Sequence, residues 1–150
     1  MRFRKLLYNV SGNNERKKIF RKNKVVIFLD LKLRMKKILV VDDDHDISAV
    51  VKMILVSKGY DVLTHDTGLH VPEIVNKFQP NLVLLDIRLP GKLGTQVCKE
   101  LKAVSAYPPI LLFSAHAQEG ESFAICDADG FIQKPFEVKQ LISAIKEHVG

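Results

Sequence analysis

The feature that most constrains the fold is a regular alternation of short apolar runs with longer segments of helical periodicity. Residues 38–41, 82–85 and 110–113 are continuous apolar runs that are partly β-branched. Such runs are typical of strands that are buried on both faces of a sheet. Residues 60–64 and 131–133 predict two shorter strands. The chain therefore predicts a sheet of five strands.

Apolar residues between these runs recur at the spacing of one helix face. In the first such segment, Ile47, Val50, Val51 and Ile54 stand at i, i+3, i+4 and i+7, which predicts an amphipathic helix. Gly59 follows it and is a typical C-terminal cap. The predicted helices cover residues 46–57, 68–78, 94–103, 116–124 and 137–149, and the fourth has the weakest periodicity.

Strict alternation of strand and helix with short connections predicts an α/β fold with a parallel sheet. Right-handed crossovers leave few topologies, and we expect helices on both faces of the sheet. At this size the common doubly wound solution is flavodoxin-like, with strand order 2-1-3-4-5. We therefore expect residues 35–150 to form one such domain.

The first 34 residues differ from the rest in charge and in pattern. They contain eleven Lys or Arg and two acidic residues, which gives a net charge of +9. Residues 35–150 contain twelve Lys or Arg and fifteen acidic residues, which gives a net charge of −3. The basic character of the whole chain is therefore confined to this segment. For the domain, we expect no direct binding to nucleic acid.

Three interpretations of residues 1–34 stay open. The segment is an upstream mis-start of the reading frame, since Met35 stands directly before the first strand; or it is a disordered basic arm that touches membrane or nucleic acid; or it is an extra strand or helix packed on the domain. We expect one of the first two.

Other targeting and covalent features are absent from the sequence. No apolar run reaches the ~18–20 residues that a membrane span needs, and no segment has the pattern of a secretory signal. Cys98 and Cys126 lack the spacing of a zinc site or a disulfide framework. We expect two reduced, buried thiols in a cytoplasmic protein.

Polar residues follow four of the predicted strands, at the point where each strand ends. In an open parallel sheet the carboxyl ends of the strands meet at one edge, where reactive groups gather. One acid after the first strand can serve as a helix N-cap, but three in succession exceed what a cap needs. The residues at this edge are Asp42, Asp43, Asp44, Asp86, Ser114 and Lys134.

The chemistry of these residue types is complementary. Clustered carboxylates repel one another unless a cation intervenes, and Mg²⁺ prefers oxygen ligands. We expect Asp43 and Asp86 to bind Mg²⁺ directly and Asp42 to act through water. A free oxygen of Asp86 can attack phosphorus. Lys134 and Ser114 can then contact the phosphoryl oxygens.

Four segments at these strand ends resemble the motifs of response-regulator receiver domains, the phosphoacceptor modules of two-component signalling. The resemblance covers residues 36–150, and four motifs in order at the expected spacing make it specific. The segments are residues 37–44, 82–91, 110–116 and 130–136.

This resemblance implies a role for each residue at the edge. Asp86 is implied to be the phosphorylated residue. Asp42 and Asp43 are implied to hold Mg²⁺ together with Asp86, and Ser114 and Lys134 to contact the phosphoryl group.

Further positions also carry roles in the family. The backbone carbonyl of Arg88 is implied to contact the metal, and its side chain to influence the lifetime of the phosphoryl group. Phe131 occupies the position of the switch aromatic, and Lys134–Pro135 is a candidate cis peptide bond. Leu93 departs from the family, which usually has an acidic residue there, and it weakens a helix cap.

The expected function is that of a single-domain, chemotaxis-type signalling switch. It would accept a phosphoryl group from a sensor histidine kinase or a histidine phosphotransfer protein, and signal to a downstream protein by contact, with no output domain. We expect a monomer or weak dimer, and no enzyme activity beyond self-directed phosphoryl acceptance and autodephosphorylation. Two alternatives remain: a receiver-like scaffold that is never phosphorylated, and a haloacid-dehalogenase-like phosphatase with a nucleophile motif at residues 42–44.

Overall fold

The computed structural model describes residues 13–104, 106–115 and 126–149. The chain divides into two units, residues 1–35 and residues 36–150. The predicted helix at residues 116–124 lies outside the described residues.

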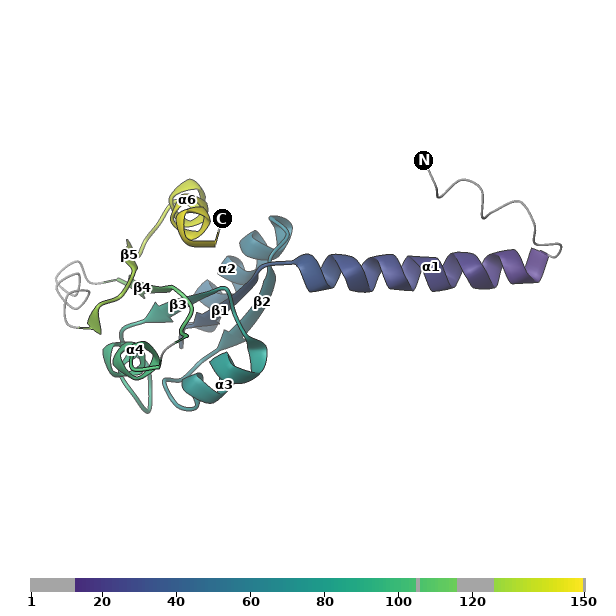
Figure 1. The fold of residues 1–150 in the computed structure, drawn as a ribbon. Coiled ribbons are helices and arrows are strands. Elements are labelled where there is room, and N and C mark those ends of the chain that lie inside the picture. Colours follow the sequence, from purple (N-terminus) through teal and green to yellow (C-terminus); the bar gives the residue numbers. More distant parts are fainter. Residues whose placement is uncertain (1–12, 105, 116–125, 150) are drawn as a thin grey trace. The chain divides into compact units, whose positions relative to one another are not determined.

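The larger unit is a five-stranded parallel sheet covered by helices on both faces, as the sequence predicted (Figure 1). The strand order is β2-β1-β3-β4-β5. The strands are β1 (Lys37–Val41), β2 (Asp61–His65), β3 (Leu82–Asp86), β4 (Ile110–Ser114) and β5 (Gly130–Gln133). The helices described here are α2 (His45–Ser57), α3 (Val71–Phe78), α4 (Gly94–Lys102) and α6 (Val138–Val149).

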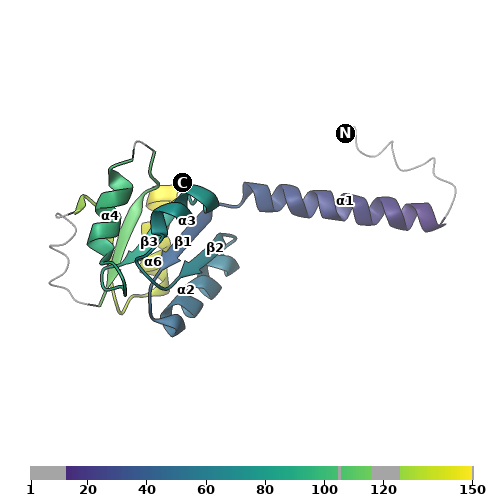
Figure 2. The ribbon, with the colours of Figure 1, turned by 90° about the horizontal axis from the view of Figure 1, so that it is seen from below.

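Two hydrophobic cores lie on the two faces of the sheet. Successive side chains of a strand point to opposite sides, so alternate residues enter different cores. In β1, Ile38 and Val40 pack with residues of α2 and α6, whereas Leu39 and Val41 pack with residues of α3 and α4. Figure 2 shows the same layers from below. Burial on both faces explains why the central strands are continuous apolar runs.

Helix α2 has defined caps at both ends. The Asp44 carboxylate accepts hydrogen bonds from the backbone N–H groups of Asp46 and Ile47, both at 3.0 Å, so Asp44 is the N-cap. At the other end Gly59 has a φ of 88°, and its N–H donates to the Val56 carbonyl at 3.0 Å. The predicted glycine cap is therefore confirmed.

Two predicted details of the helices are wrong. Val50 was expected on the buried stripe of α2, but it is 48% exposed, and the buried face is formed by Ser48, Val51 and Leu55. The second predicted helix begins at residue 71 rather than 68, because His70 has a φ of 59° that a continuous helix cannot contain.

The two cysteines are buried free thiols, as predicted. The Cys98 thiol donates to the backbone carbonyl of Cys126 at 3.3 Å. Burial raises the pKa of Cys98, and the neighbouring Cys126 raises it further.

The smaller unit contains one helix, α1 (Asn13–Arg34). The expectation of a disordered extension or an upstream mis-start stays a prediction. Residues 13–34 contain neither Gly nor Pro, so no residue in this range interrupts the helix. Its side chains from residue 23 to 34 are exposed, including Phe28 and Leu33. Within the described ranges, no helix is long and apolar enough to cross a membrane.

Candidate functional site

Three charged side chains lie at the carboxyl ends of their strands, on the face of the sheet that is covered by α2 and α6. Each stands two positions after a buried apolar residue on the side covered by α2 and α6, so the alternation of the strand directs it to the same side. The pairs are Val40 and Asp42, Leu84 and Asp86, and Ile132 and Lys134. The predicted residues therefore converge from three strand ends because the strands share one direction.

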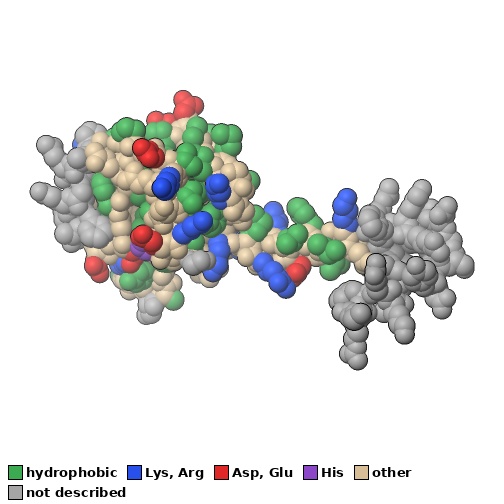
Figure 3. Space-filling view, turned by 90° about the horizontal axis from the view of Figure 1, so that it is seen from above, with side chains coloured by type: hydrophobic (Ala, Val, Ile, Leu, Met, Phe, Trp, Pro, Cys, Tyr) green, Lys and Arg blue, Asp and Glu red, His purple; other side chains and the backbone are tan. Residues whose placement is uncertain are grey.

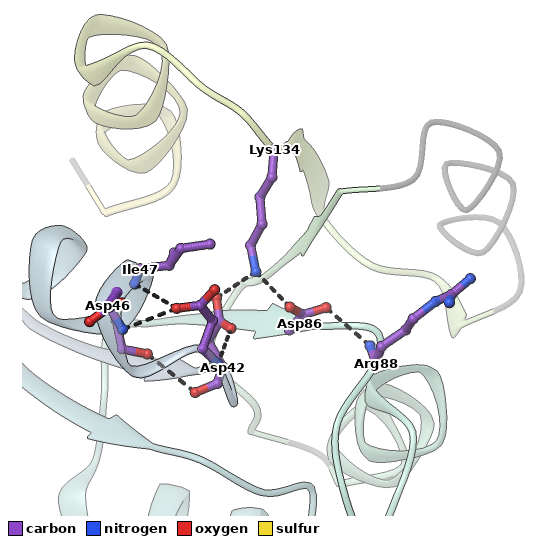
Figure 4. Close-up of polar contacts among 8 residues, drawn as sticks. Asp42, Asp46, Ile47, Asp86, Arg88 and Lys134 are labelled. Atoms are coloured by element: carbon purple, nitrogen blue, oxygen red, sulfur yellow. Dashed lines mark hydrogen bonds and ion pairs between the residues drawn. The ribbon is translucent and has the colours of Figure 1, made fainter.

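Lys134 forms ion pairs with two of the predicted carboxylates. Its Nζ lies 2.5 Å from Oδ2 of Asp42 and 2.6 Å from Oδ2 of Asp86 (Figure 4). All three residues are buried, with exposed fractions of 7% or less. Buried charges are costly unless paired, so this contact compensates the burial of one carboxylate but not of both.

Two buried carboxylates share one lysine, and the pKa of Asp42 lies above its usual value. Burial of the carboxylate raises it, and the nearby charge of Asp86 acts in the same direction. Hydrogen bonds from Lys134 and from the backbone N–H of Asp44 (3.0 Å) oppose the shift without cancelling it.

A third carboxylate completes a set of oxygen donors. Oxygen atoms of Asp42, Asp43 and Asp86 lie within 4.8 Å of one another, and Asp43 is exposed. Three carboxylates and one lysine sum to a formal charge of −2, since −3 + 1 = −2. A divalent cation balances this charge, and carboxylate oxygens are the ligands that Mg²⁺ prefers. The residues therefore fit the predicted magnesium site.

The loop after β3 holds the other side of Asp86. The backbone N–H of Arg88 donates to Oδ1 of Asp86 at 3.0 Å. Gly94 packs against this loop, and a Cβ there would lie 1.9 Å from the Asp86 carbonyl oxygen. Only glycine allows α4 to start this close to the acceptor strand. The metal contact of the Arg88 carbonyl and the effect of its side chain stay predictions.

Ser114 and Phe131 occupy neighbouring strands on the β5 side. Ser114 is 1% exposed, and its carbonyl accepts a hydrogen bond from the Lys134 backbone N–H at 2.7 Å. Phe131 is partly buried against the core that contains α3 and α4. The Lys134–Pro135 bond is cis, as the resemblance implied. The phosphoryl contact of Ser114 and the switch role of Phe131 stay predictions.

Sequence reasoning missed the aromatic support of Lys134 and a second anchor of Asp42. The Phe113 ring centroid lies 4.4 Å from the Lys134 Nζ, and the Phe136 ring packs 5.0 Å from Phe113. The Ser48 hydroxyl donates to the Asp42 carbonyl at 3.2 Å. One signal was available in the sequence: Ser48 stands three and seven positions before Val51 and Leu55, on one side of the helix.

Comparison with known proteins identifies relatives of this fold and site. The sequence model of the response regulator receiver domain matches residues 38–146. The BeF3-activated N-terminal receiver domain of Klebsiella pneumoniae RstA is 28% identical, with a TM-score of 0.71 over 76% of this chain and 98% of that chain. The chemotaxis protein CheY4 of Vibrio cholerae is 25% identical, with a TM-score of 0.70 over 76% and 98%.

A third solved structure shows the same fold with a metal. The receiver domain of sensor histidine kinase PA1611 from Pseudomonas aeruginosa is 23% identical, with a TM-score of 0.72 over 77% of this chain and 98% of that chain. In that protein a magnesium ion is coordinated in the active site cleft.

Proposed function

Because the chain belongs to the response regulator receiver domain family, we propose that it is a phosphorylation-controlled signalling switch with Asp86 as its acceptor. The observation that carries this proposal is the contact of Lys134 with both Asp42 and Asp86, beside the third carboxylate of Asp43. Phosphoryl transfer requires position and positive charge more than covalent chemistry, and this arrangement supplies both once a divalent cation is bound.

The accessibility of the carboxylates favours Asp86 over Asp42 as the acceptor. The Asp42 side chain is fully buried, whereas 11% of the Asp86 side chain is exposed. Asp86 is also held from two sides, by Lys134 Nζ and by the Arg88 N–H. A held and accessible carboxylate is pre-oriented for attack on an incoming phosphorus.

In the proposed reaction an Asp86 oxygen forms a bond to the phosphorus of a phosphohistidine. The N–P bond of the donor breaks, and its electron pair stays on the histidine nitrogen. When bound, Mg²⁺ neutralises charge on the phosphoryl oxygens. Lys134 then exchanges its contact with the Asp86 carboxylate for one with a phosphoryl oxygen, and Ser114 donates to another.

We propose a histidine kinase or a histidine phosphotransfer protein as the donor. Phosphorylation shifts the population between two states of Ser114 and Phe131, and the altered face around β5 is read by a downstream protein. The haloacid-dehalogenase-like alternative is disfavoured by Asp44, because its carboxylate caps α2 and is not directed at the site as that motif requires.

The proposal is tested by incubating the full chain with acetyl phosphate and Mg²⁺ and measuring its intact mass. We expect a gain of one phosphoryl group that requires Mg²⁺ and is absent from Asp86→Asn. Asp66→Asn, an exposed acid after β2, is the matched control and should be modified like the wild type. A folded wild-type chain that gains no phosphoryl group would support the unphosphorylated scaffold instead.

A further inference from the structure

A groove lies between the C-terminal end of α2 and the outer side of α6, apart from the carboxylate site. It has a volume of about 380 Å³ and combines positive charge with an apolar floor. Its lining residues are Lys58, Val138, Lys139, Ile142, Ser143 and Lys146. We infer that this groove is a docking surface for an acidic, amphipathic helix of a partner protein.

Within the described part of the chain, the groove is lined by three lysines and by no acidic residue. Among the residues that the structure describes, no carboxylate forms an ion pair with Lys58, Lys139 or Lys146. Figure 3 shows the domain from the side of α6, where several Lys or Arg side chains lie among hydrophobic ones, with Asp or Glu side chains near them. By contrast, Lys92 and Lys102 elsewhere on the domain are each paired with a carboxylate. Unpaired lysines around a groove favour an acidic occupant.

The spacing within α6 specifies the shape of that occupant. Lys139 and Lys146 are seven residues apart, so they lie on one side of the helix, roughly 10 Å from each other along its axis. Ile142 and Ser143 lie between them, and Lys58 approaches from α2. The complement is a helix with acids at i and i+7 and a large apolar residue at i+3 or i+4.

The apolar part of the groove argues against a small anion. Ile142 is 9% exposed at the floor, and Val138 is 48% exposed at the rim. A phosphate ion would leave this apolar surface in water. An amphipathic helix covers the apolar surface and pairs with the separated lysines at the same time.

The groove is distinct from the phosphoryl-acceptor site. No residue that lines the groove belongs to that site. Lys58 is the far end of the groove, since α2 starts beside the site at His45 and reaches Lys58 after 13 residues, roughly 20 Å away, whereas Val138 at the near end follows Lys134 by four residues. The inference therefore does not depend on phosphorylation of Asp86. An Asp86→Asn variant should bind the same peptides as the wild type, so failure of either proposal leaves the other intact.

A peptide-display experiment tests the inference without a known partner. A library of random 12-residue peptides is selected on the full chain, and the enriched peptides are measured against variants by fluorescence anisotropy. We expect enriched peptides with Asp or Glu seven positions apart and a large apolar residue between them. Lys139→Glu/Lys146→Glu should weaken their binding at least about 10-fold, which is about 1.4 kcal/mol.

Matched controls locate the binding on this groove. Lys77→Glu/Lys99→Glu makes the same change of charge on α3 and α4 and should change affinity less than about 2-fold. Val138→Ser should weaken binding about 3-fold through the lost apolar contact. Wild-type affinity should fall as NaCl is raised.

Four results would overturn the inference. The first is that no peptide is enriched, and the second is that the enriched peptides have no excess of acidic residues. The third is an equal loss of peptide affinity in the two double variants. The fourth is that the chain binds phosphatidylserine vesicles but no peptide, and that Lys139→Glu/Lys146→Glu abolishes this binding.

Discussion

At the scale of single residues, the site depends on one lysine shared by two buried carboxylates. The sequence predicted all members of this set, because each follows a strand and parallel strands end at one edge. It could not predict that Lys134 contacts Asp42 as well as Asp86, since a pairing of side chains depends on strand twist and on the long, flexible lysine. The Phe113 ring beneath the ammonium was missed for the same reason.

Removing the lysine charge should make the fold dependent on metal. In Lys134→Met, Asp42 and Asp86 lose their shared cation, and we expect a loss of about 3 kcal/mol in the free energy of unfolding in EDTA. Millimolar Mg²⁺ should restore part of that loss and stabilise this variant more than the wild type. Urea denaturation with and without Mg²⁺ measures both effects.

Lys139→Met, which removes an exposed lysine, is the matched control for this prediction. It should change neither the free energy of unfolding in EDTA nor the stabilisation by Mg²⁺. Equal stabilisation of the wild type and Lys134→Met by Mg²⁺ would show that the lysine and the metal do not share these carboxylates.

Removing the charge of Asp42 should stabilise the metal-free domain. Its raised pKa means that the folded state holds the proton more tightly than the unfolded state. The ionised carboxylate therefore costs stability above the raised pKa, and this cost disappears as the pH falls below the unfolded value of 3.8. Asp42→Asn should gain about 1 kcal/mol at pH 7 in EDTA and lose Mg²⁺ binding.

Thermal denaturation of wild type and Asp42→Asn across pH 3 to 8 tests this sign. The difference in stability between Asp42→Asn and the wild type should decrease as the pH is lowered. An advantage that grows toward acid, or a variant less stable at pH 7, would contradict the burial argument.

At the scale of elements, periodicity predicted the strands better than the helix faces. All five strands were confirmed to within one residue, and three of them were predicted from continuous apolar runs bounded by polar or turn residues. A helix that is apolar on more than one side has several possible buried faces. For that reason Val50 was predicted to be buried, whereas it is exposed in α2. The weak cap at Leu93 is confirmed, and Gln96 compensates by accepting from the Leu93 N–H at 3.2 Å.

Two glycines at helix ends should respond differently to substitution. Gly94→Ala places a Cβ against the Asp86 carbonyl, and we expect a cost of about 2–3 kcal/mol and weaker Mg²⁺ binding. In Gly59→Ala the added Cβ has no atom within 4 Å, so the cost comes only from the positive φ and is about 1 kcal/mol. The Mg²⁺ affinity should be unchanged. Urea denaturation and calorimetric Mg²⁺ titration separate the two cases. Equal Mg²⁺ affinity in both variants would contradict the link between the start of α4 and the acceptor.

At the scale of the whole molecule, the domain and the basic segment are separate units. Residues 36–150 contain both cores, the site and the groove, whereas residues 1–35 form a unit of their own. The change of charge in the sequence falls at the same position as this division, but the lack of a clear period hid the helix α1.

A chain that starts at Met35 should therefore keep the stability and the phosphoryl acceptance of the full chain. We expect the same urea midpoint and the same extent of modification by acetyl phosphate, because the described core residues all lie after residue 35. Loss of either property would show that the first 34 residues support the domain.

The central claim, that Asp86 is the acceptor of a magnesium-dependent site, is tested most directly by trapping the acyl phosphate. The full chain is treated with acetyl phosphate and Mg²⁺, reduced with borohydride, and digested for tandem mass spectrometry. Reduction converts a phosphorylated aspartate to homoserine. The account predicts homoserine at position 86 alone and only when Mg²⁺ is present. Homoserine at Asp42 or Asp43, or at position 86 without Mg²⁺, would contradict it.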